Sequence, residues 1–287
     1  MSLLHPTSVP QTAPSEASPE TTAPPQPNIQ QRLERPTADD IYEQVARNAR
    51  RELKRGNLAL ALSGLVGGIT MGLTPLATSI TRAQLGTSAA ALFTTHFLYP
   101  VGFIAVILGR AQLFTENTLY PVALVLAERR HVWNTLRLWS VVLPANVTGA
   151  FLFALLAVRT GALKPEYVSA LTQLGVEAAK GSPGHIFWSG VIGGWIIAMV
   201  AWLVSGSHSI TGSVLLIWLL AFVVGLGGFA HCIASSGEIL GAVLQGQVTF
   251  SHYFYWLLHA VLGNITGGIL MVTFLEYGQV KAADHDE

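Results

Sequence analysis

The clearest feature of the sequence is a series of apolar runs, each long enough to cross a membrane. A helix rises 1.5 Å per residue, so about 20 apolar residues cross the roughly 30 Å of hydrocarbon in a bilayer. We predict one membrane-spanning helix in each run of this length. The predicted spans are 57–80, 88–108, 134–158, 186–206, 212–231 and 254–276. The fold class predicted is therefore an all-α polytopic membrane protein with six transmembrane helices.

Two of these spans are followed by apolar pieces too short to cross a membrane alone. Residues 118–127 follow the second span, and residues 239–248 follow the fifth. We interpret both pieces as the second halves of broken helices. Non-helical backbone at membrane depth is tolerated only where protein buries it or where it lines a cavity. The two breaks therefore indicate where a pathway through the membrane would lie.

The segments that flank the apolar runs have a different composition. The first 38 residues are rich in Pro, Thr, Ser and Gln and have few large apolar residues, which is typical of disorder. An amphipathic helix is expected next, with Asp39 and Asp40 as its cap, and its basic residues suit either a membrane surface or solvent. The predicted divisions are a disordered tail at 1–38, a cytoplasmic amphipathic helix at 39–56, the transporter domain at 57–277 and a C-terminal tail at 278–287.

Composition narrows the function further. The chain is 51% hydrophobic and 11% charged, whereas an ordinary soluble domain has about 25% charged residues. Its 16 basic and 16 acidic residues cancel, so no nucleic-acid partner is indicated. The single cysteine, Cys232, excludes an internal disulfide and a Cys-rich metal site. We find no cluster of metal ligands and no Ser–His pair at catalytic spacing, so neither a catalytic site, a metal site nor a cofactor is expected.

Basic residues near the span ends predict the orientation. Cytoplasmic loops of membrane proteins carry an excess of Lys and Arg. Nine basic residues fall on one side, namely Arg47, Arg50, Arg51, Lys54, Arg55, Arg129, Arg130, Arg137 and Lys281. Four fall on the other, namely Arg82, Arg159, Lys164 and Lys180. We therefore expect both termini to lie in the cytoplasm. The protein itself is expected in the inner membrane of the cell.

The chain also repeats itself. The motif Ser63–Gly68 of the first span returns as Ser189–Gly194 in the fourth, and Asn146–Ala150 of the third returns as Asn264–Gly268 in the sixth. Because each repeat contains three spans, which is an odd number, the second repeat enters the membrane from the side opposite to the first. The sequence thus predicts two inverted repeats with broken second and fifth helices, an architecture of channels and transporters. The repeats cover about 57–160 and 186–277.

One histidine lies within the second break and is the main candidate for chemistry. His231 follows the Gly227–Gly228 pair in an otherwise apolar span, where an imidazole is costly to charge and can exchange a proton near neutral pH. His96 and His259 lack such surroundings and are interpreted as packing residues.

Three charged residues near the breaks allow two readings each. Arg110 and Glu116 could pair across the first break or face cytoplasmic water, and we favour water. Glu238 could line the pathway or sit at a helix start, where the amide dipole favours a negative charge, and we favour the helix start. The Gly-Gly pairs at 67–68, 193–194 and 267–268 predict close packing of helices.

Three motifs resemble those of the formate/nitrite transporter family. Gln112–Asn117 resembles the family's loop in the broken second helix, Gly228–Ala234 its central histidine segment, and Gly263–Gly268 its signature in the sixth helix. The resemblance covers roughly residues 40 to 280. The chain looks like a divergent member with an extended N-terminal tail.

The resemblance implies an aquaporin-like protomer in a homopentamer within the lipid bilayer, each protomer passing a small monoanion such as formate, nitrite, hydrosulfide or lactate. The implied substrate pathway contains His231, the loop residues Phe114 and Thr115, the constriction residues Tyr99, Phe103 and Val224, and also Ser235 and Lys180. The implied structural motif residues are Asn146, Asn264, Gly267 and Gly268.

Some positions depart from the family pattern. Ala230 stands where a Glu is usual and Ser235 where an Asn is usual. Gly194 stands where a pore-facing Asn is expected, and Lys180 lies two residues from the expected lysine. The leading hypothesis is proton-linked transport of a small anion, or its conjugate acid, through His231. The alternatives are a channel for a neutral small solute and a non-conducting sensor or assembly protein on the same fold.

Overall fold

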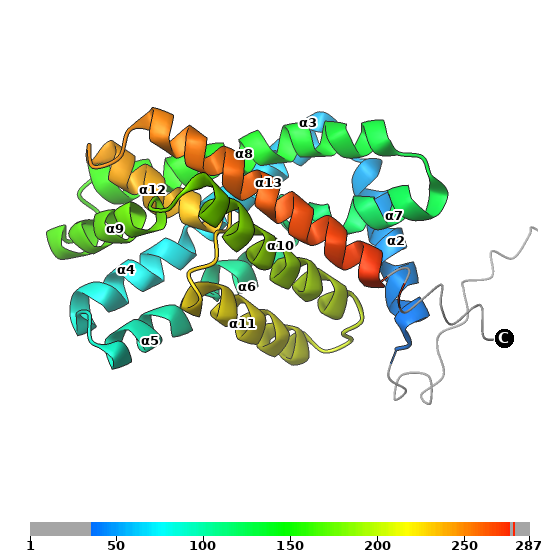
Figure 1. Ribbon diagram of the computed structural model, residues 1–287, viewed down its shortest axis with the longest axis horizontal. Helices are drawn as coiled ribbons and strands as arrows, with labels where there is room; N and C mark the ends of the chain where they lie inside the picture. Colours follow the sequence, from blue (N-terminus) through cyan, green and yellow to red (C-terminus); the bar gives the residue numbers. More distant parts are fainter. Residues whose placement is uncertain (1–35, 276–277, 279–287) are drawn as a thin grey trace, which may run out of the picture. The chain divides into compact units, whose positions relative to one another are not determined.

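The computed structural model describes residues 36–275 and Gly278, and within these residues all regular structure is helical (Figure 1). The predictions for most of the two tails, and for Lys281, lie outside the described residues. The predicted division into tails and a central domain stays a prediction. The helices are α2 (Ala38–Leu53), α3 (Asn57–Met71), α4 (Leu73–Leu85), α5 (Ala89–Phe97), α6 (Val101–Leu108), η1 (Glu116–Thr118), α7 (Tyr120–Glu128), α8 (Val132–Arg159), α9 (Pro165–Ala178), α10 (Pro183–Ser205), α11 (Ile210–Leu226), α12 (Ala234–Leu244) and α13 (Phe250–Leu275).

The apolar runs form the predicted spans. Five helical segments of the described chain are long and apolar enough to cross a membrane, namely Asn57–Leu85, Ala89–Leu108, Val132–Arg159, Pro183–Ser205 and Phe250–Leu275. The predicted fifth span, 212–231, is not one continuous helix. Helix α11 ends at Leu226, residues 227–233 form a break, and α12 begins at Ala234. The second span is likewise broken between α6 and α7. The fold is therefore that of a polytopic membrane protein, as predicted.

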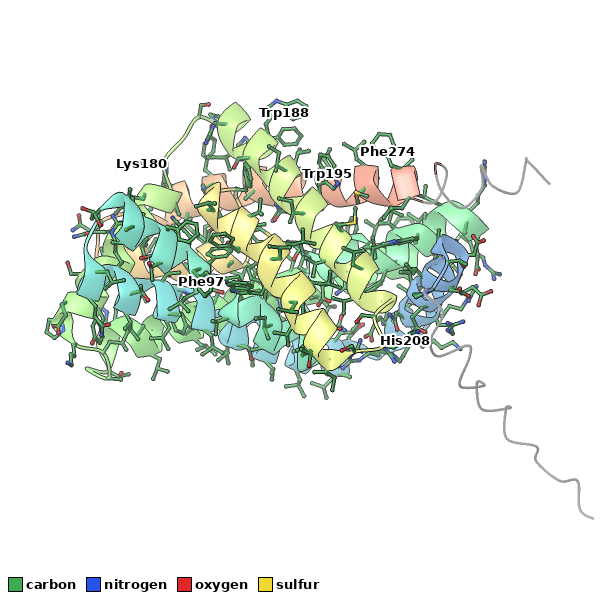
Figure 2. The ribbon with its side chains drawn as sticks, turned by 90° about the horizontal axis from the view of Figure 1, so that it is seen from below. Phe97, Lys180, Trp188, Trp195, His208 and Phe274 are labelled. Carbon is green, nitrogen blue, oxygen red and sulfur yellow. The ribbon has the colours of Figure 1, made fainter. Side chains whose placement is uncertain are left out.

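The outward surfaces of the long helices are apolar. Trp188 and Trp195 on α10 and Phe274 on α13 are labelled in Figure 2, and their side chains are 64%, 54% and 68% exposed. Large exposed apolar side chains of this kind are unfavourable in water. They suit contact with hydrocarbon, because lipid tails are as apolar as the side chains themselves.

The two repeats pack in the same way. Helix α3 packs along α8 in the first repeat, and α10 packs along α13 in the second. Glycines permit the close approach: a Cβ atom on Gly68 would collide with the Asn146 carbonyl, and one on Gly194 with the Asn264 carbonyl. Gly194, which stands where the resemblance expects a pore-facing Asn, faces the α13 backbone, in agreement with the packing role predicted for the Gly-Gly pairs.

The N-terminal helix differs from its prediction in two respects. Its cap is Thr37, whose hydroxyl accepts from the Asp40 amide while the Asp40 carboxylate accepts from Thr37, so Asp40 is the third residue of a capping box. The apolar stripe of α2, including Val45 and Ala49, is buried against the protein itself, where α2 contacts α7 and α10.

Helix α9 was not predicted. Its 14 residues are too few to span a membrane, and they lie between the two predicted repeats, where the sequence predicts no element. Pro165 begins the helix, where a missing amide hydrogen costs nothing. Its buried side chains include Leu171 and Leu174, and α9 packs on α4 and α12. The α9 end of the protein is therefore covered by a helix.

Candidate functional site

Two buried asparagines hold the breaks in shape, one in each repeat. Asn146 of α8 donates to the carbonyls of Gly64 and Gln112 at 2.7 and 2.8 Å, and its side-chain oxygen accepts from the Phe114 amide at 2.8 Å. The bonds to Gln112 and Phe114 satisfy backbone groups that the broken helix leaves without partners, as burial requires, and the bond to Gly64 connects them to α3. The first break is thus fixed to both helices of its repeat.

Asn264 of α13 makes the same three bonds in the second repeat. It donates to the carbonyls of Gly190 and Ala230 at 2.8 and 2.9 Å and accepts from the Cys232 amide at 2.9 Å. Ala230 and Cys232 lie 118 residues after their counterparts in the first break, as Asn264 does after Asn146. The two breaks are therefore structural equivalents.

Two serines complete the equivalence. The Ser63 hydroxyl accepts from the Gln112 amide at 3.1 Å, and the Ser189 hydroxyl accepts from the Ala230 amide at 3.0 Å. The other motif residues also lie at helix contacts: a Cβ atom on Gly267 would meet the Val191 carbonyl, and one on Gly268 would meet Thr118. Gly268 thereby brings α13 against the first break.

One pair of polar side chains connects the two breaks. The hydroxyl Oγ1 of Thr115 lies 2.8 Å from Nε2 of His231, and both residues are fully buried at 0% exposure. Thr115 belongs to the first break and His231 to the second. The sequence indicates both residues as pathway candidates, whereas the hydrogen bond between them is seen only in the structure.

Hydrogen bonding fixes the tautomer of His231. The Ala234 amide lies 3.1 Å from Nδ1 and must donate to it, because an amide hydrogen has no other role. Nδ1 is therefore the unprotonated nitrogen, and Nε2 carries the hydrogen and donates it to Thr115. The Thr115 hydroxyl hydrogen remains free to donate to a third group. Because Ala234 begins α12, the positive end of this helix also points at the pair.

Aromatic and apolar side chains close the space on one side of the pair. The Phe103 ring packs edge-to-face on the His231 ring, with centroids 4.9 Å apart, and Tyr99 lies 5.6 Å beyond Phe103. Phe103 and Val224 are fully buried and Tyr99 is 7% exposed. The Phe114 ring packs on Trp139 of α8, with ring centroids 5.9 Å apart, and its role in the pathway stays a prediction.

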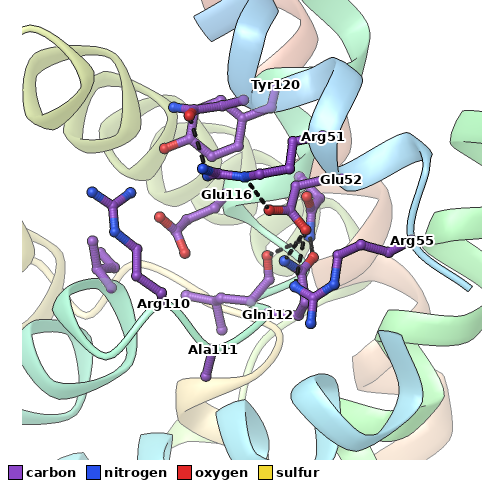
Figure 3. A pocket seen from close by; sticks show the side chains of 12 residues that line it. Arg51, Glu52, Arg55, Arg110, Ala111, Gln112, Glu116 and Tyr120 are labelled. Carbon is purple, nitrogen blue, oxygen red and sulfur yellow. Dashed lines mark hydrogen bonds and ion pairs between the residues drawn. The ribbon is translucent and has the colours of Figure 1, made fainter. Parts of the chain in front are cut away.

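A cavity of about 520 Å³ opens on the side of the first break (Figure 3). We call it the α2-side vestibule, because α2 contributes Asn48, Arg51 and Glu52 to its lining and Arg55 follows directly after that helix. Glu52 is bound by Arg55 at 3.0 Å and by the Gln112 side chain at 2.7 Å. The N-terminal helix is thereby tied directly to the first break.

A second cavity, of about 240 Å³, lies at the α9 end and is called the α9-side vestibule. The predicted pathway residues Tyr99, Val224, Ser235 and Lys180 all line it. The remaining lining residues with titratable side chains are His96, Glu177, His185 and Glu238. The packing interpretation of His96 is therefore incomplete, because this residue also faces a cavity.

The two vestibules are related by the repeat. Ile107, Arg110, Ala111, Asn117 and Tyr120 line the α2-side vestibule, and the residues 118 positions later line the α9-side vestibule. Those equivalents are Gly225, Gly228, Phe229, Ser235 and Glu238. One cavity thus lies at each break, with the Thr115–His231 pair belonging to both breaks.

The structure shows where Arg110, Glu116 and Glu238 lie, the three charged residues for which the sequence allowed two interpretations. Glu238 lies beyond the first turn of α12, which begins at Ala234, so its interpretation as a helix-start residue is wrong. Glu116 is only 8% exposed and lines the α2-side vestibule with Arg110. Within the described residues no ion pair joins these two. The described chain also contains no group of three His, Cys, Asp or Glu residues placed to hold a metal ion.

Known proteins share this fold and sequence pattern. Residues 39–278 match the family described as formate/nitrite transporter. The chain is 31% identical to the inner membrane protein YfdC of Escherichia coli (strain K12) over 246 residues, which are 84% of this chain and 78% of that protein.

Two solved structures have the same fold. An FNT family ion channel has a TM-score of 0.75 at 19% identity, covering 85% of this chain and 99% of its own. A pentameric formate channel with formate bound has a TM-score of 0.64 at 18% identity, covering 80% and 97%. With the family match extending over most of the chain, this protein belongs to the formate/nitrite transporter family.

Proposed function

We propose that this protein carries a small monovalent anion across a membrane together with a proton, using the Thr115–His231 pair as the polar midpoint of its pathway. The observation that carries the proposal is the buried 2.8 Å contact between these side chains, at the breaks that also line the two vestibules. One protein of the same fold is a formate channel with formate bound, which supports formate as the first substrate to test.

The apolar segment explains why a proton would accompany the anion. An unpaired ion moved from water into an apolar environment pays a large desolvation penalty, whereas its conjugate acid pays much less. Phe103 and Val224, both fully buried, would face the solute beside the pair. The Thr115 hydroxyl, held by His231, would donate a hydrogen bond to the passing solute. His231 acts in this account as the group that orients Thr115.

The wider arrangement belongs to the same proposal. We infer that the protein is a homopentamer in the inner membrane, because the formate channel of the same fold is pentameric and YfdC is an inner membrane protein. The α2 end, with Arg50, Arg51 and Arg55, would face the cytoplasm by the positive-inside rule, together with both termini.

Two other functions remain candidates because Tyr99, Phe103 and Val224 leave little exposed surface in the constriction. A narrow apolar constriction suits a neutral small solute, whose passage would not depend on a proton gradient. A constriction that stays closed suits a non-conducting sensor or assembly protein. Both predict no gradient-driven uptake of any anion.

The test is uptake of formate, nitrite, acetate, lactate and hydrosulfide into proteoliposomes, with and without an imposed pH gradient. Wild type is expected to take up at least one anion faster with the gradient, and His231→Phe is expected to abolish that uptake while the oligomer stays intact. Undiminished uptake in the variant would remove His231 from the mechanism.

A further inference from the structure

Each vestibule contains one buried glutamate that the account above does not use. Glu116 in the α2-side vestibule and Glu238 in the α9-side vestibule are both 8% exposed. In the described part of the chain, neither carboxyl group has a hydrogen bond or an ion pair. In Figure 3 the Glu116 side chain points into the cavity between Arg110 and Glu52.

The two glutamates are not equivalent in the repeat. Glu238 lies 118 residues after Tyr120, whereas the counterpart of Glu116 is Ala234. A carboxyl group has thus been placed in each of two matching cavities at different repeat positions. Inherited symmetry therefore does not explain their presence on both sides of the Thr115–His231 pair.

Each carboxyl group shares its cavity with other titratable side chains. Arg110 faces Glu116, while Glu52 in the same cavity is already bound by Arg51 and Arg55. The cavity of Glu238 also holds Tyr99, His96, Glu177, Lys180 and His185. Of these, Glu177 is paired with Arg82 at 3.0 Å.

His231 is poorly placed to supply a proton itself. Its Nδ1 accepts from the Ala234 amide and its Nε2 donates to Thr115, so both nitrogens are in use. Protonating Nδ1 would set two hydrogens against each other and break the bond to α12. An anion that must become neutral before the apolar segment therefore needs another proton donor close to the vestibule.

We propose that Glu238 and Glu116 are the proton-exchange sites of the pathway, one in each vestibule. Glu238 has no ion-pair partner among the described residues, and an ionised carboxylate without a counter-ion is costly away from water, so the carboxylic acid is the form suited to Glu238 as a donor. Arg110 beside Glu116 suits the carboxylate form there, which can accept a proton. On the α9 side the O–H bond of the Glu238 acid breaks and an O–H bond forms on the entering anion. Water in the vestibule then reprotonates the Glu238 carboxylate.

On the α2 side the sequence is reversed. The arriving acid gives its proton to the Glu116 carboxylate, which passes it to water, and the anion leaves past Arg110. This inference rests on the proposed function, because it concerns the source and the destination of the co-transported proton.

The test uses the full-length protein in proteoliposomes with radiolabelled formate and an imposed pH gradient. Glu238→Gln keeps the size of the side chain and removes the exchangeable proton. We expect the maximal uptake rate to fall at least tenfold and its dependence on external pH to flatten, whereas Glu238→Asp retains a pH-dependent rate. Glu166→Gln is the matched control, because Glu166 is exposed in the first turn of α9.

Labelling provides a measurement that needs no variant. A hydrophobic carbodiimide reacts with protonated carboxyl groups, so it is expected to modify Glu238 in the wild-type oligomer and to block uptake, and formate is expected to protect. Absence of modification at Glu238 would overturn the proposal even if Glu238→Gln failed to fold.

The outcomes separate this inference from the function on which it rests. If Glu238→Gln keeps the wild-type rate and pH profile while His231→Phe is inactive, the proton-exchange role is wrong and the proposed function stands. If wild type shows no gradient-driven uptake, both are wrong. Glu238-dependent uptake of methylammonium without formate uptake would identify a cation site instead.

Discussion

The Thr115 hydroxyl and the His231 imidazole lie 2.8 Å apart, although Thr115 belongs to the first repeat and His231 to the second. The pair exists only because two broken helices enter from opposite sides and meet. Any change that moves one break relative to the other should therefore disturb the pair, even when it touches neither residue.

The asparagines that fix the breaks should be important for stability. Asn146→Leu leaves the buried Phe114 amide and the Gln112 carbonyl in the break without this partner, and each unsatisfied buried group costs about 1–3 kcal/mol. We expect a loss of roughly 2 kcal/mol or more, measured as a lower Tm of the purified oligomer. Asn264→Leu should behave alike because Asn264 makes the same bonds.

A suitable control for this prediction is Thr148→Val. Thr148 is on the same helix, is exposed, and donates to the Pro144 carbonyl of its own helix. Its Tm should stay near that of wild type. Equal effects of Asn146→Leu and Thr148→Val would argue against the role of the asparagine.

Arg110 combines an unfavourable backbone conformation with a charge in the vestibule. Its φ is 57°, and the equivalent residue Gly228 has φ 62°, a region that costs a non-glycine residue about 1–2 kcal/mol. Arg110→Gly should therefore keep or raise the Tm while raising the formate concentration for half-maximal uptake, because a cation leaves the cavity.

Arg110→Ala separates the two effects of that substitution. It removes the charge but retains a side chain in the left-handed region, so uptake should weaken equally without any gain in Tm. A Tm of Arg110→Gly below that of Arg110→Ala would contradict this explanation of the backbone.

Phe103 should determine the size limit of the solute. Its ring is fully buried and packs on His231 at 4.9 Å, so Phe103→Ala removes most of the constriction at that point. We expect lactate uptake to rise at least tenfold relative to formate uptake, whereas Phe103→Leu should change the ratio little. Competition between labelled formate and unlabelled lactate measures it.

Much of the fold and part of this site could be predicted from the sequence. Apolar runs identify spans because hydrocarbon tolerates little else, and the repeated Asn motifs predict the symmetry that Asn146 and Asn264 now explain. His231 stands out because an imidazole in an apolar span needs a reason. Helix α9 was missed because a short amphipathic helix has no length signal.

The position of Glu238 could not be inferred for a different reason. Its distance from the start of α12 depends on where the break ends, and helix boundaries are the least reliable part of any reading from sequence. The docking of α2 was also hidden, because its apolar stripe suits protein and membrane equally well. Only the packed structure distinguishes these alternatives.

The contact between α2 and α7 predicts a dependence on pH. Glu128 accepts from Arg50 at 2.8 Å and is bound by His131 and Arg130, and these partners lower the pKa of its carboxyl to about 2. Because the folded pKa is below the unfolded value, this stabilisation is present at neutral pH and is lost as the pH falls from about 4.5 towards 2.

The measurement is the Tm difference between wild type and Glu128→Gln as a function of pH. It should be largest near pH 7 and shrink on acidification below about pH 4.5, and high salt should reduce it because Arg50 and Arg130 are exposed. A difference that grows with acidification would contradict the assigned partners.

The central claim is that a solute crosses with a proton past the Thr115–His231 pair. It is tested most directly by following labelled formate and internal pH together in the same proteoliposomes, for wild type, Thr115→Val and His231→Phe. The account predicts one proton entering with each formate in wild type and neither entering in the variants. Formate entry without acidification of the interior, or equal entry in the variants, would contradict it.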